Sequence, residues 1–167
     1  TSWPIWPRAA TATSAAFPAA SGYTYCCSAR ARDTLGTLSS WAPETCTATP
    51  VDDRGLTRSS CWTTGTSASY YRSTYTRSSR YATILTRTGI VAKRIAIVAT
   101  TCPTCGFVMV SWGSSLLKLI NFYSPTTVTK KLITVATFSS ARSGTLTIKL
   151  ASSGKYVYID GVAIRRN

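Results

Sequence analysis

The last hundred-odd residues of the chain are a succession of short strand patterns separated by turns, and this constrains the fold more than any other feature. Several of these patterns alternate apolar and polar residues with a period of two, which indicates strands with one buried and one solvated face. No helical stretch separates them. Short strands at nearly regular spacing predict an all-β fold, an antiparallel β-sandwich or jelly roll. The clearest runs are residues 94–100, 107–112, 131–137, 144–150 and 157–164.

Groups that serve catalysis are scarce in this chain. It contains no His, and its only carboxylate side chains are those of Asp33, Glu44, Asp52, Asp53 and Asp160. Ser-His-Asp triads, Cys-His pairs and His-based metal sites are therefore excluded. A glycosidase needs two carboxyl groups that face each other across a sugar, whereas Asp52 and Asp53 are neighbours in a Pro-flanked segment. We expect a protein that is not an enzyme, with no catalytic residue, no metal site and no cofactor.

The charge balance is strongly basic, with 19 Lys and Arg against 5 Asp and Glu and a net charge of +14. Such a charge favours association with polyanions, whether nucleic acid, anionic wall polymers or acidic lipid headgroups. The alternative is that Arg and Lys only keep a Thr-rich sheet surface soluble. No apolar run approaches the roughly 20 residues that a helix needs to cross a bilayer, so we expect no membrane insertion.

Composition divides the chain into four parts. Residues 1–21 are rich in Pro, Ala, Thr and Ser, so we expect an extended or disordered lead. Residues 22–49 predict a β-hairpin with a turn at Gly36, too small to be stable alone. Residues 50–56 contain a Pro, two acids and a Gly without periodicity, which indicates a linker. The sandwich is expected over residues 57–167.

The hairpin segment carries a resemblance to a known domain. Tyr25 begins a Tyr-x-Cys pattern, and Ala-Arg-Ala-Arg-Asp, Gly36 and Ser-Ser-Trp follow at residues 29–33, 36 and 39–41. This order resembles the final two strands of a bacterial fibronectin type III domain. The resemblance implies that Tyr25 forms the tyrosine corner of that fold. Residues 1–20 do not resemble the five strands that precede these two.

The C-terminal two thirds of the chain carry a second resemblance. The pattern consists of the following elements, in this order: Trp62, Gly65-Thr66-Ser67, Tyr70-Tyr71, Thr74-Tyr75, Tyr81-Ala82-Thr83 and the final Tyr-Ile-Asp-Gly-Val at residues 158–162. The pattern resembles C-terminal β-sandwich modules of secreted and surface proteins of Gram-positive bacteria, which are similar to galactose-binding-like jelly rolls. It implies a non-catalytic, extracellular module that belongs to a longer parent chain.

Six cysteines in a short chain indicate an oxidising compartment, consistent with an extracellular or cell-surface location. The Cys-Pro-Thr-Cys-Gly motif at residues 102–106 is similar to a zinc knuckle, but tetrahedral zinc needs two further ligands that the sequence does not offer. We therefore predict a disulfide between Cys102 and Cys105. A second disulfide is predicted between Cys26 and Cys46 across the hairpin. Cys27 and Cys61 either pair, stay free or reflect sequence drift.

Aromatic residues are the best candidates for a binding surface, because sugar recognition combines flat apolar faces with nearby hydrogen-bond donors. The predicted ligand contacts are Tyr70, Tyr71, Trp112 and Tyr123, with Arg72 and Arg77 as polar partners. Adjacent tyrosines at 70 and 71 cannot both face inward on a regular strand. Other aromatics are assigned to the core on burial habits, namely Trp62, Tyr75, Tyr81 and Phe107.

The function expected from these features is binding to a carbohydrate or to the cell wall. One alternative is a purely structural spacer or cap with no ligand. Another is non-specific binding of a polyanion, although no RNA-recognition, helix-turn-helix or zinc-finger pattern supports nucleic acid. Asp160, the sole acid after residue 56, is expected to accept hydrogen bonds rather than hold calcium, which prefers six to eight oxygens.

Overall fold

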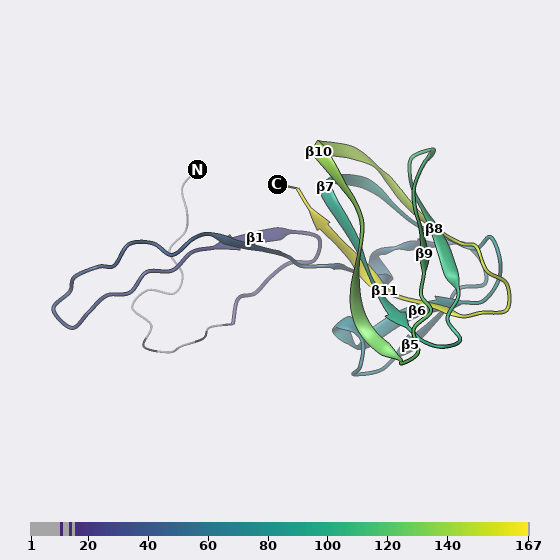
Figure 1. Ribbon diagram of the computed structural model, residues 1–167, viewed down its shortest axis with the longest axis horizontal. Helices are drawn as coiled ribbons and strands as arrows, with labels where there is room; N and C mark the ends of the chain where they lie inside the picture. The colour runs from purple at the N-terminus through teal and green to yellow at the C-terminus, as the bar shows by residue number, and fades with distance from the viewer. Residues whose placement is uncertain (1–10, 12–13, 15, 167) are drawn as a thin grey trace.

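The computed structural model describes residues 11, 14 and 16–166, and the described chain is nearly all β. A short hairpin, β1 (Thr24–Cys27) and β2 (Thr45–Ala48), precedes a larger antiparallel sheet system. That system is ordered β5-β6-β11-β7-β10-β8-β9, with β3 added to β11 and β4 added to β7. The all-β sandwich or jelly-roll prediction is confirmed (Figure 1). Among the described residues no helix is long and apolar enough to cross a membrane.

Two long strands organise the sandwich. β7 (Ile84–Thr101) and β10 (Val128–Leu150) pair with each other along most of their lengths. Register shifts interrupt this pairing at several points, and such irregularities let a strand bend and twist. In the hydrogen-bonding order these two strands lie between two groups. On one side are β5 (Thr63–Thr66), β6 (Thr74–Ser78) and β11 (Val157–Arg165), and on the other are β8 (Phe107–Trp112) and β9 (Ser115–Asn121).

The predicted runs fall on these strands with one difference. Residues 94–100 lie within β7, 107–112 coincide with β8, and 157–164 lie within β11. The runs at 131–137 and 144–150 were expected as two strands but are parts of the single strand β10. The intervening residues remain extended, and the register shift between Thr137 and Arg142 absorbs the polar insertion that suggested a turn.

The core is formed by side chains that alternate inward from the long strands. The fully buried side chains at its centre belong to one cluster, which includes Ile95, Ile97 and Ala99 of β7, Val108 and Val110 of β8, and Phe122. Trp62 also joins this core, as predicted.

Three aromatics assigned to the core lie elsewhere. Phe107 is 36% exposed because the fully buried Val108 and Val110 take the inward positions of β8. Tyr81 is 60% exposed in the turn between β6 and β7. Tyr75 is half-buried on the outward face of β6, where the inward neighbours are Thr76 and Ser78.

The segment predicted as a linker, residues 50–56, is instead part of the sandwich. β3 (Val51–Asp52) pairs with Gly161 and Val162 of β11, and a 3-10 turn η1 (Asp53–Gly55) follows. Val51 and Leu56 are buried, and Asp53 has no exposed surface. The prediction failed because a two-residue strand and one tight turn produce no periodic pattern. β4 (Thr57–Arg58) comes next and pairs with β7.

The hairpin extends away from the sandwich as an exposed arm (Figure 1). Cys26 and Cys46 are directly opposite in its register and form a disulfide. The Tyr25 hydroxyl accepts a hydrogen bond from the backbone N–H of Ala20 at 2.9 Å. Thr24 attaches the base of the arm to the sandwich by donating to the Ile164 carbonyl at 3.2 Å. Most of the predicted disordered lead, residues 1–10, 12, 13 and 15, lies outside the described residues.

Candidate functional site

Four tyrosines and one arginine gather on the outward face of the β5–β6–β11 sheet. Ring centroids are 4.3 Å apart for Tyr70 and Tyr75, 5.8 Å for Tyr75 and Tyr158, and 6.0 Å for Tyr156 and Tyr158. The Arg77 guanidinium lies 5.0 Å from the Tyr156 ring centroid and 5.9 Å from that of Tyr158. We call Tyr70, Tyr75, Arg77, Tyr156 and Tyr158 the tyrosine–arginine cluster. It presents a row of partly exposed aromatic rings beside a cation.

Strand alternation produces most of this cluster. On β11, Val157 and Ile159 point into the core with no exposed surface, so Tyr158 between them points outward. On β6 the inward Thr76 leaves Tyr75 and Arg77 on the outward face. Tyr158 is directly opposite Arg77 in the antiparallel register, which explains why ring and guanidinium meet.

Gly65 of β5 makes room for the Tyr75 ring. The two residues are register partners, and a Cβ atom on Gly65 would overlap the end of that ring. Backbone φ is not the reason for glycine here, because Gly65 lies in regular strand. The Tyr75 side chain therefore lies flat across β5, which a larger residue at position 65 would prevent.

A buried set of carboxylates lies under the turn that carries Tyr70. Asp160 Oδ1 accepts the backbone N–H of Tyr71 at 2.8 Å. Asp53 Oδ1 accepts the Thr74 hydroxyl at 2.6 Å, and Asp53 Oδ2 accepts the Thr76 hydroxyl. Asp53 and Asp160 have no exposed surface. These bonds fix the start and the end of the turn from two different elements, β11 and η1.

The turn needs such support because its backbone is unusual. Within η2 (Tyr71–Ser73), Arg72 and Ser73 have φ values of 50° and 59°, in the left-handed region that non-glycine residues rarely adopt. Backbone hydrogen bonds from Ser73 N–H to the Tyr70 carbonyl (3.0 Å) and from Tyr70 N–H to the Ser67 carbonyl (3.1 Å) close the turn. Tyr70 is thereby held over the Tyr75 ring.

Burial changes the acid–base behaviour of two groups here. It raises the pKa of Asp160 from 3.8 to about 6, and the nearby carboxylates of Asp53 and Asp52 add to the rise, while the Tyr71 N–H and Lys130 oppose it. Burial is also the main cause of a raised pKa for Tyr70. The pKa of Arg77 is raised in turn by its hydrogen bond to Tyr158, so this side chain stays a cation.

The structure brings only two of the six predicted ligand contacts together, Tyr70 and Arg77. The Tyr71 hydroxyl turns away and donates to the Pro50 carbonyl at 3.3 Å. Arg72 is exposed with its guanidinium 5.9 Å from the Tyr71 ring centroid. Trp112 lies on β8, where it packs against Phe138 and covers Gly144.

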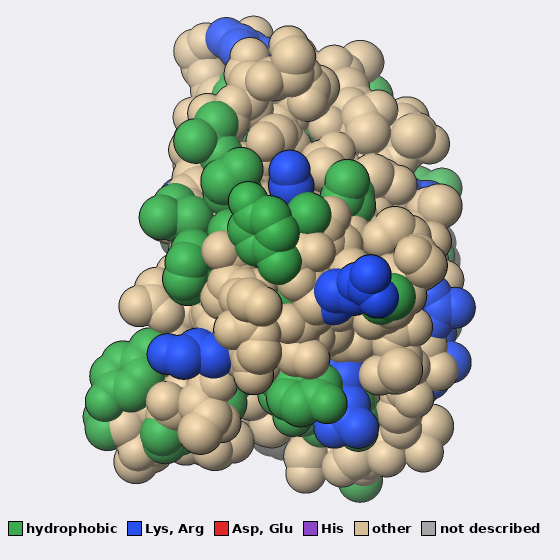
Figure 2. All heavy atoms as spheres, turned by 90° about the vertical axis from the view of Figure 1, so that its right-hand side faces the viewer, with side chains coloured by type: hydrophobic (Ala, Val, Ile, Leu, Met, Phe, Trp, Pro, Cys, Tyr) green, Lys and Arg blue, Asp and Glu red, His purple; other side chains and the backbone are tan. Residues whose placement is uncertain are grey.

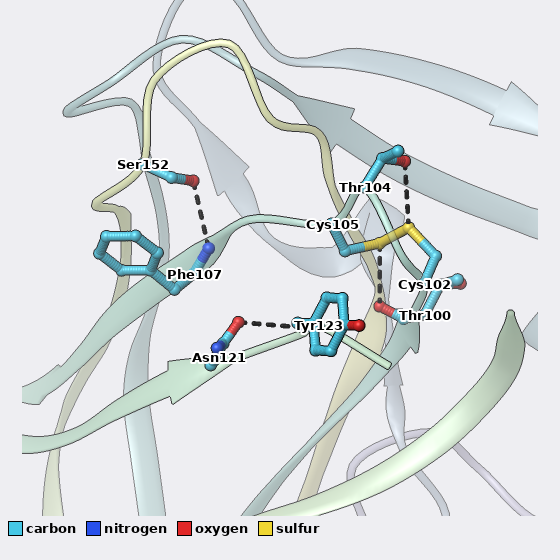
Figure 3. The surroundings of a disulfide bond; sticks show 8 residues. All are labelled: Thr100, Cys102, Thr104, Cys105, Phe107, Asn121, Tyr123 and Ser152. Carbon is cyan, nitrogen blue, oxygen red and sulfur yellow. Dashed lines mark hydrogen bonds between the residues drawn. A yellow bond between two sulfur atoms is a disulfide. The ribbon is translucent and has the colours of Figure 1, made fainter. Parts of the chain in front are cut away.

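Tyr123 lies beside the second disulfide, apart from the cluster. Its side chain is 60% exposed, and its backbone N–H donates to Asn121 Oδ1 at 3.0 Å (Figure 3). Cys102 and Cys105 are both buried and joined as predicted, at the tip between β7 and β8. Ser152 anchors the next residues by accepting the Phe107 N–H at 3.1 Å (Figure 3). This loop is a structural clamp.

Sequence reasoning missed three members of the cluster: Tyr75, Tyr156 and Tyr158. Their signal was present as period-two alternation, Thr-Tyr-Thr-Arg-Ser at 74–78 and Tyr-Val-Tyr-Ile at 156–159. Strict alternation puts Tyr75 with Arg77 and Tyr156 with Tyr158 on single faces. Which faces point outward depended on knowing that Thr76 and Val157 are buried.

The described residues contain one group of side chains with the spacing that a metal ion needs. Among the residues that the structure describes, only Cys26, Glu44 and Cys46 bring three candidate ligand atoms within 4.8 Å of one another. Both sulfurs of that group are joined in a disulfide, so neither is a thiolate that could bind a metal. Cys27 and Cys61 are free and exposed.

The fold, rather than any sequence motif, relates this chain to known proteins. No protein-family model matches it, and no curated protein sequence matches it. The Agl-KA catalytic domain matches 72% of this chain with a TM-score of 0.55 at 11% identity. At this identity the likeness concerns the fold alone.

Two further solved structures extend the likeness. The Paenibacillus xanthan lyase matches 71% of this chain (TM-score 0.52, 13% identity), and an exo-β-1,3-galactanase from Phanerochaete chrysosporium with β-1,3-galactotriose matches 74% (TM-score 0.53, 12% identity). The matched parts are 28%, 13% and 30% of the Agl-KA, lyase and galactanase chains. The chain thus spans less than a third of each neighbour.

Proposed function

We propose that this chain is a non-catalytic, extracellular carbohydrate-binding module, and that the tyrosine–arginine cluster is its ligand contact. One observation carries the proposal: Tyr70, Tyr75, Tyr156 and Tyr158 form a continuous row of rings on one sheet face. Sugar rings pack their apolar faces on aromatic side chains, and tyrosine hydroxyls and an arginine provide hydrogen bonds to sugar hydroxyls. The fold shared with carbohydrate-active enzymes supports this reading.

The absence of a catalytic role is supported by the state of the acids. The chain has no His, and Asp53 and Asp160 are fully buried under the η2 turn. Asp52 is partly exposed and accepts a hydrogen bond from Thr74 at 3.2 Å. These carboxylates hold the turn, and they do not face one another across an open groove as hydrolysis of a glycosidic bond requires.

The extracellular setting is supported by the two disulfides, which persist in oxidising compartments. The resemblance to C-terminal modules of Gram-positive surface proteins, preceded by a fibronectin-like strand pair, supports attachment to a longer secreted or surface protein. Such a module would keep its parent protein near a polysaccharide.

The test is affinity gel electrophoresis of the full chain against immobilised polysaccharides, including β-1,3-galactan and xanthan. We expect retardation by at least one polysaccharide, and about tenfold weaker binding for Tyr158→Ala, equivalent to about 1.4 kcal/mol. Tyr81→Ala is the matched control, because Tyr81 is an exposed tyrosine outside the cluster. Retention by none of the polysaccharides, or equal losses for the two variants, would contradict the proposal. Release of reducing ends would contradict its non-catalytic part.

A further inference from the structure

The sandwich carries almost no negative charge on its surface. No Asp or Glu occurs between Asp53 and Asp160, whereas Lys and Arg recur throughout that interval. The two acids that bound it are fully buried. Figure 2 shows the consequence on one face, where Lys and Arg side chains are scattered and no Asp or Glu is visible. Asp52, partly exposed and bonded to Thr74, is the one acid of residues 50–166 with exposed surface.

Cations also border the tyrosine–arginine cluster itself. Lys130 reaches the loop that precedes Tyr70 and donates to the Ala68 carbonyl at 3.4 Å. Arg54 donates to the Gly65 carbonyl at 3.1 Å, but its charge is offset by Asp53, 3.3 Å away. That ion pair is the only salt bridge among residues 11, 14 and 16–166. Arg77 and Lys130 therefore form no salt bridge with a carboxylate among these residues, although Lys130 is near enough to Asp160 to lower the pKa of that carboxyl.

We propose that the ligand of the tyrosine–arginine cluster is an acidic polysaccharide, with a sugar carboxylate paired to Arg77. This rests on the proposed function and narrows it to one class of glycan. Arg77 lies against two tyrosine rings, an arrangement that fixes the guanidinium plane and leaves N–H groups at its edge for a carboxylate. The tyrosine row then packs against the faces of adjoining sugar rings. Arg77 attracts the sugar carboxylate at short range, and the basic surface of the sandwich attracts the anionic polymer over a longer range.

The experiment compares two polymers that differ only in charge. Polygalacturonate and its carboxyl-reduced derivative have the same backbone and linkage, so affinity for the full chain is measured for both by titration in 150 mM NaCl with EDTA. We expect polygalacturonate to bind about tenfold or more tightly than the reduced polymer, as a charge-assisted pair implies. Arg77→Gln should remove most of that difference.

Arg142→Gln is the matched control, because Arg142 is an exposed arginine that also stacks on an aromatic ring, 5.1 Å from the Phe138 centroid. It changes the net charge equally and should alter the affinity less than about twofold. If Arg77→Gln and Arg142→Gln lower the affinity for polygalacturonate equally, the proposal is overturned in favour of a general cationic surface. A single-stranded oligonucleotide that binds as tightly as polygalacturonate would overturn it in favour of any polyanion.

The two proposals fail in different ways. Equal binding of both polymers would overturn the acidic class while leaving carbohydrate binding intact. Loss of binding to both polymers and to all neutral glycans would overturn the proposed function as well. The comparison between the two polymers uses the unaltered protein, so it does not depend on the folding of any variant.

Discussion

Asp160, in the last strand of the sandwich, accepts the backbone N–H of Tyr71 at 2.8 Å, 89 residues earlier in the chain. This bond ties η2, and with it Tyr70, to the core of the protein. The other oxygen of Asp160 is buried and has no hydrogen-bond partner among the described residues. A carboxylate held in this way is disfavoured when charged, which is why its pKa rises to about 6.

The first prediction concerns pH. The pKa of Asp160 is about 6 in the folded protein, above the ordinary value of 3.8, so the folded state binds this proton more tightly than the unfolded state. Its contribution to stability is therefore fully present below about pH 4 and is lost as the pH rises through about 6. In Asp160→Asn the amide oxygen still accepts the Tyr71 N–H without a charge. We expect this variant to be at least as stable as the wild type at pH 7.

Urea unfolding of both proteins at pH 4, 5, 6 and 7 checks this. The free energy of unfolding of the wild type, relative to that of the variant, should decrease across the series. A difference that stays constant, or one that increases with pH, would show that Asp160 is not destabilised by its charge in the folded state.

The second prediction concerns Gly65. In Gly65→Ala the new Cβ overlaps the Tyr75 ring, which must move and lose its contact with Tyr70. We expect glycan affinity to fall by about 1 kcal/mol, the value of one aromatic pair. Gly144→Ala is the control, since its Cβ overlaps Trp112 in the same way but outside the cluster. Affinity electrophoresis should show weaker glycan binding for Gly65→Ala and unchanged binding for Gly144→Ala. If the two variants bind the glycan equally well, Tyr75 is not part of the site.

The sequence predicted the strands of the sandwich well because strand alternation is local. Val108 and Val110 against Phe107, or Val157 and Ile159 against Tyr158, can be recognised from neighbouring residues. The cluster was predicted only in part, since it depends on the register between Arg77 and Tyr158, residues 81 positions apart. The role of Asp53 was hidden for the same reason: Asp53 lies in the turn η1, and its partners Thr74 and Thr76 lie in strand β6. Nothing near Asp53 in sequence distinguishes a buried acid from a solvated one.

The third prediction separates the two disulfides. Cys102 and Cys105 are buried in the core, whereas Cys26 and Cys46 join the strands of an arm that extends from the sandwich. We expect Cys102→Ala with Cys105→Ala to lower the stability of the sandwich by about 2–4 kcal/mol. Cys26→Ala with Cys46→Ala should change the stability of the sandwich by less than about 0.5 kcal/mol, because this bond joins the two strands of the arm and none of the sandwich. Thermal unfolding of both double variants measures this, and equal losses would mean that the arm and the sandwich unfold together.

The last prediction concerns where the sandwich begins. A chain that starts at residue 57 lacks β3 and η1, and with them the buried side chains of Val51, Asp53 and Leu56. Loss of Asp53 also leaves the buried Thr76 hydroxyl without its acceptor. We expect a chain of residues 50–167 to unfold cooperatively in urea, and a chain of residues 57–167 to be less stable by more than about 3 kcal/mol. Gly161→Ala in the full chain tests the same contact, because its Cβ would overlap the Val51 carbonyl oxygen and separate β3 from β11. Equal unfolding midpoints for the two fragments would show that residues 50–56 are dispensable, as a linker would be.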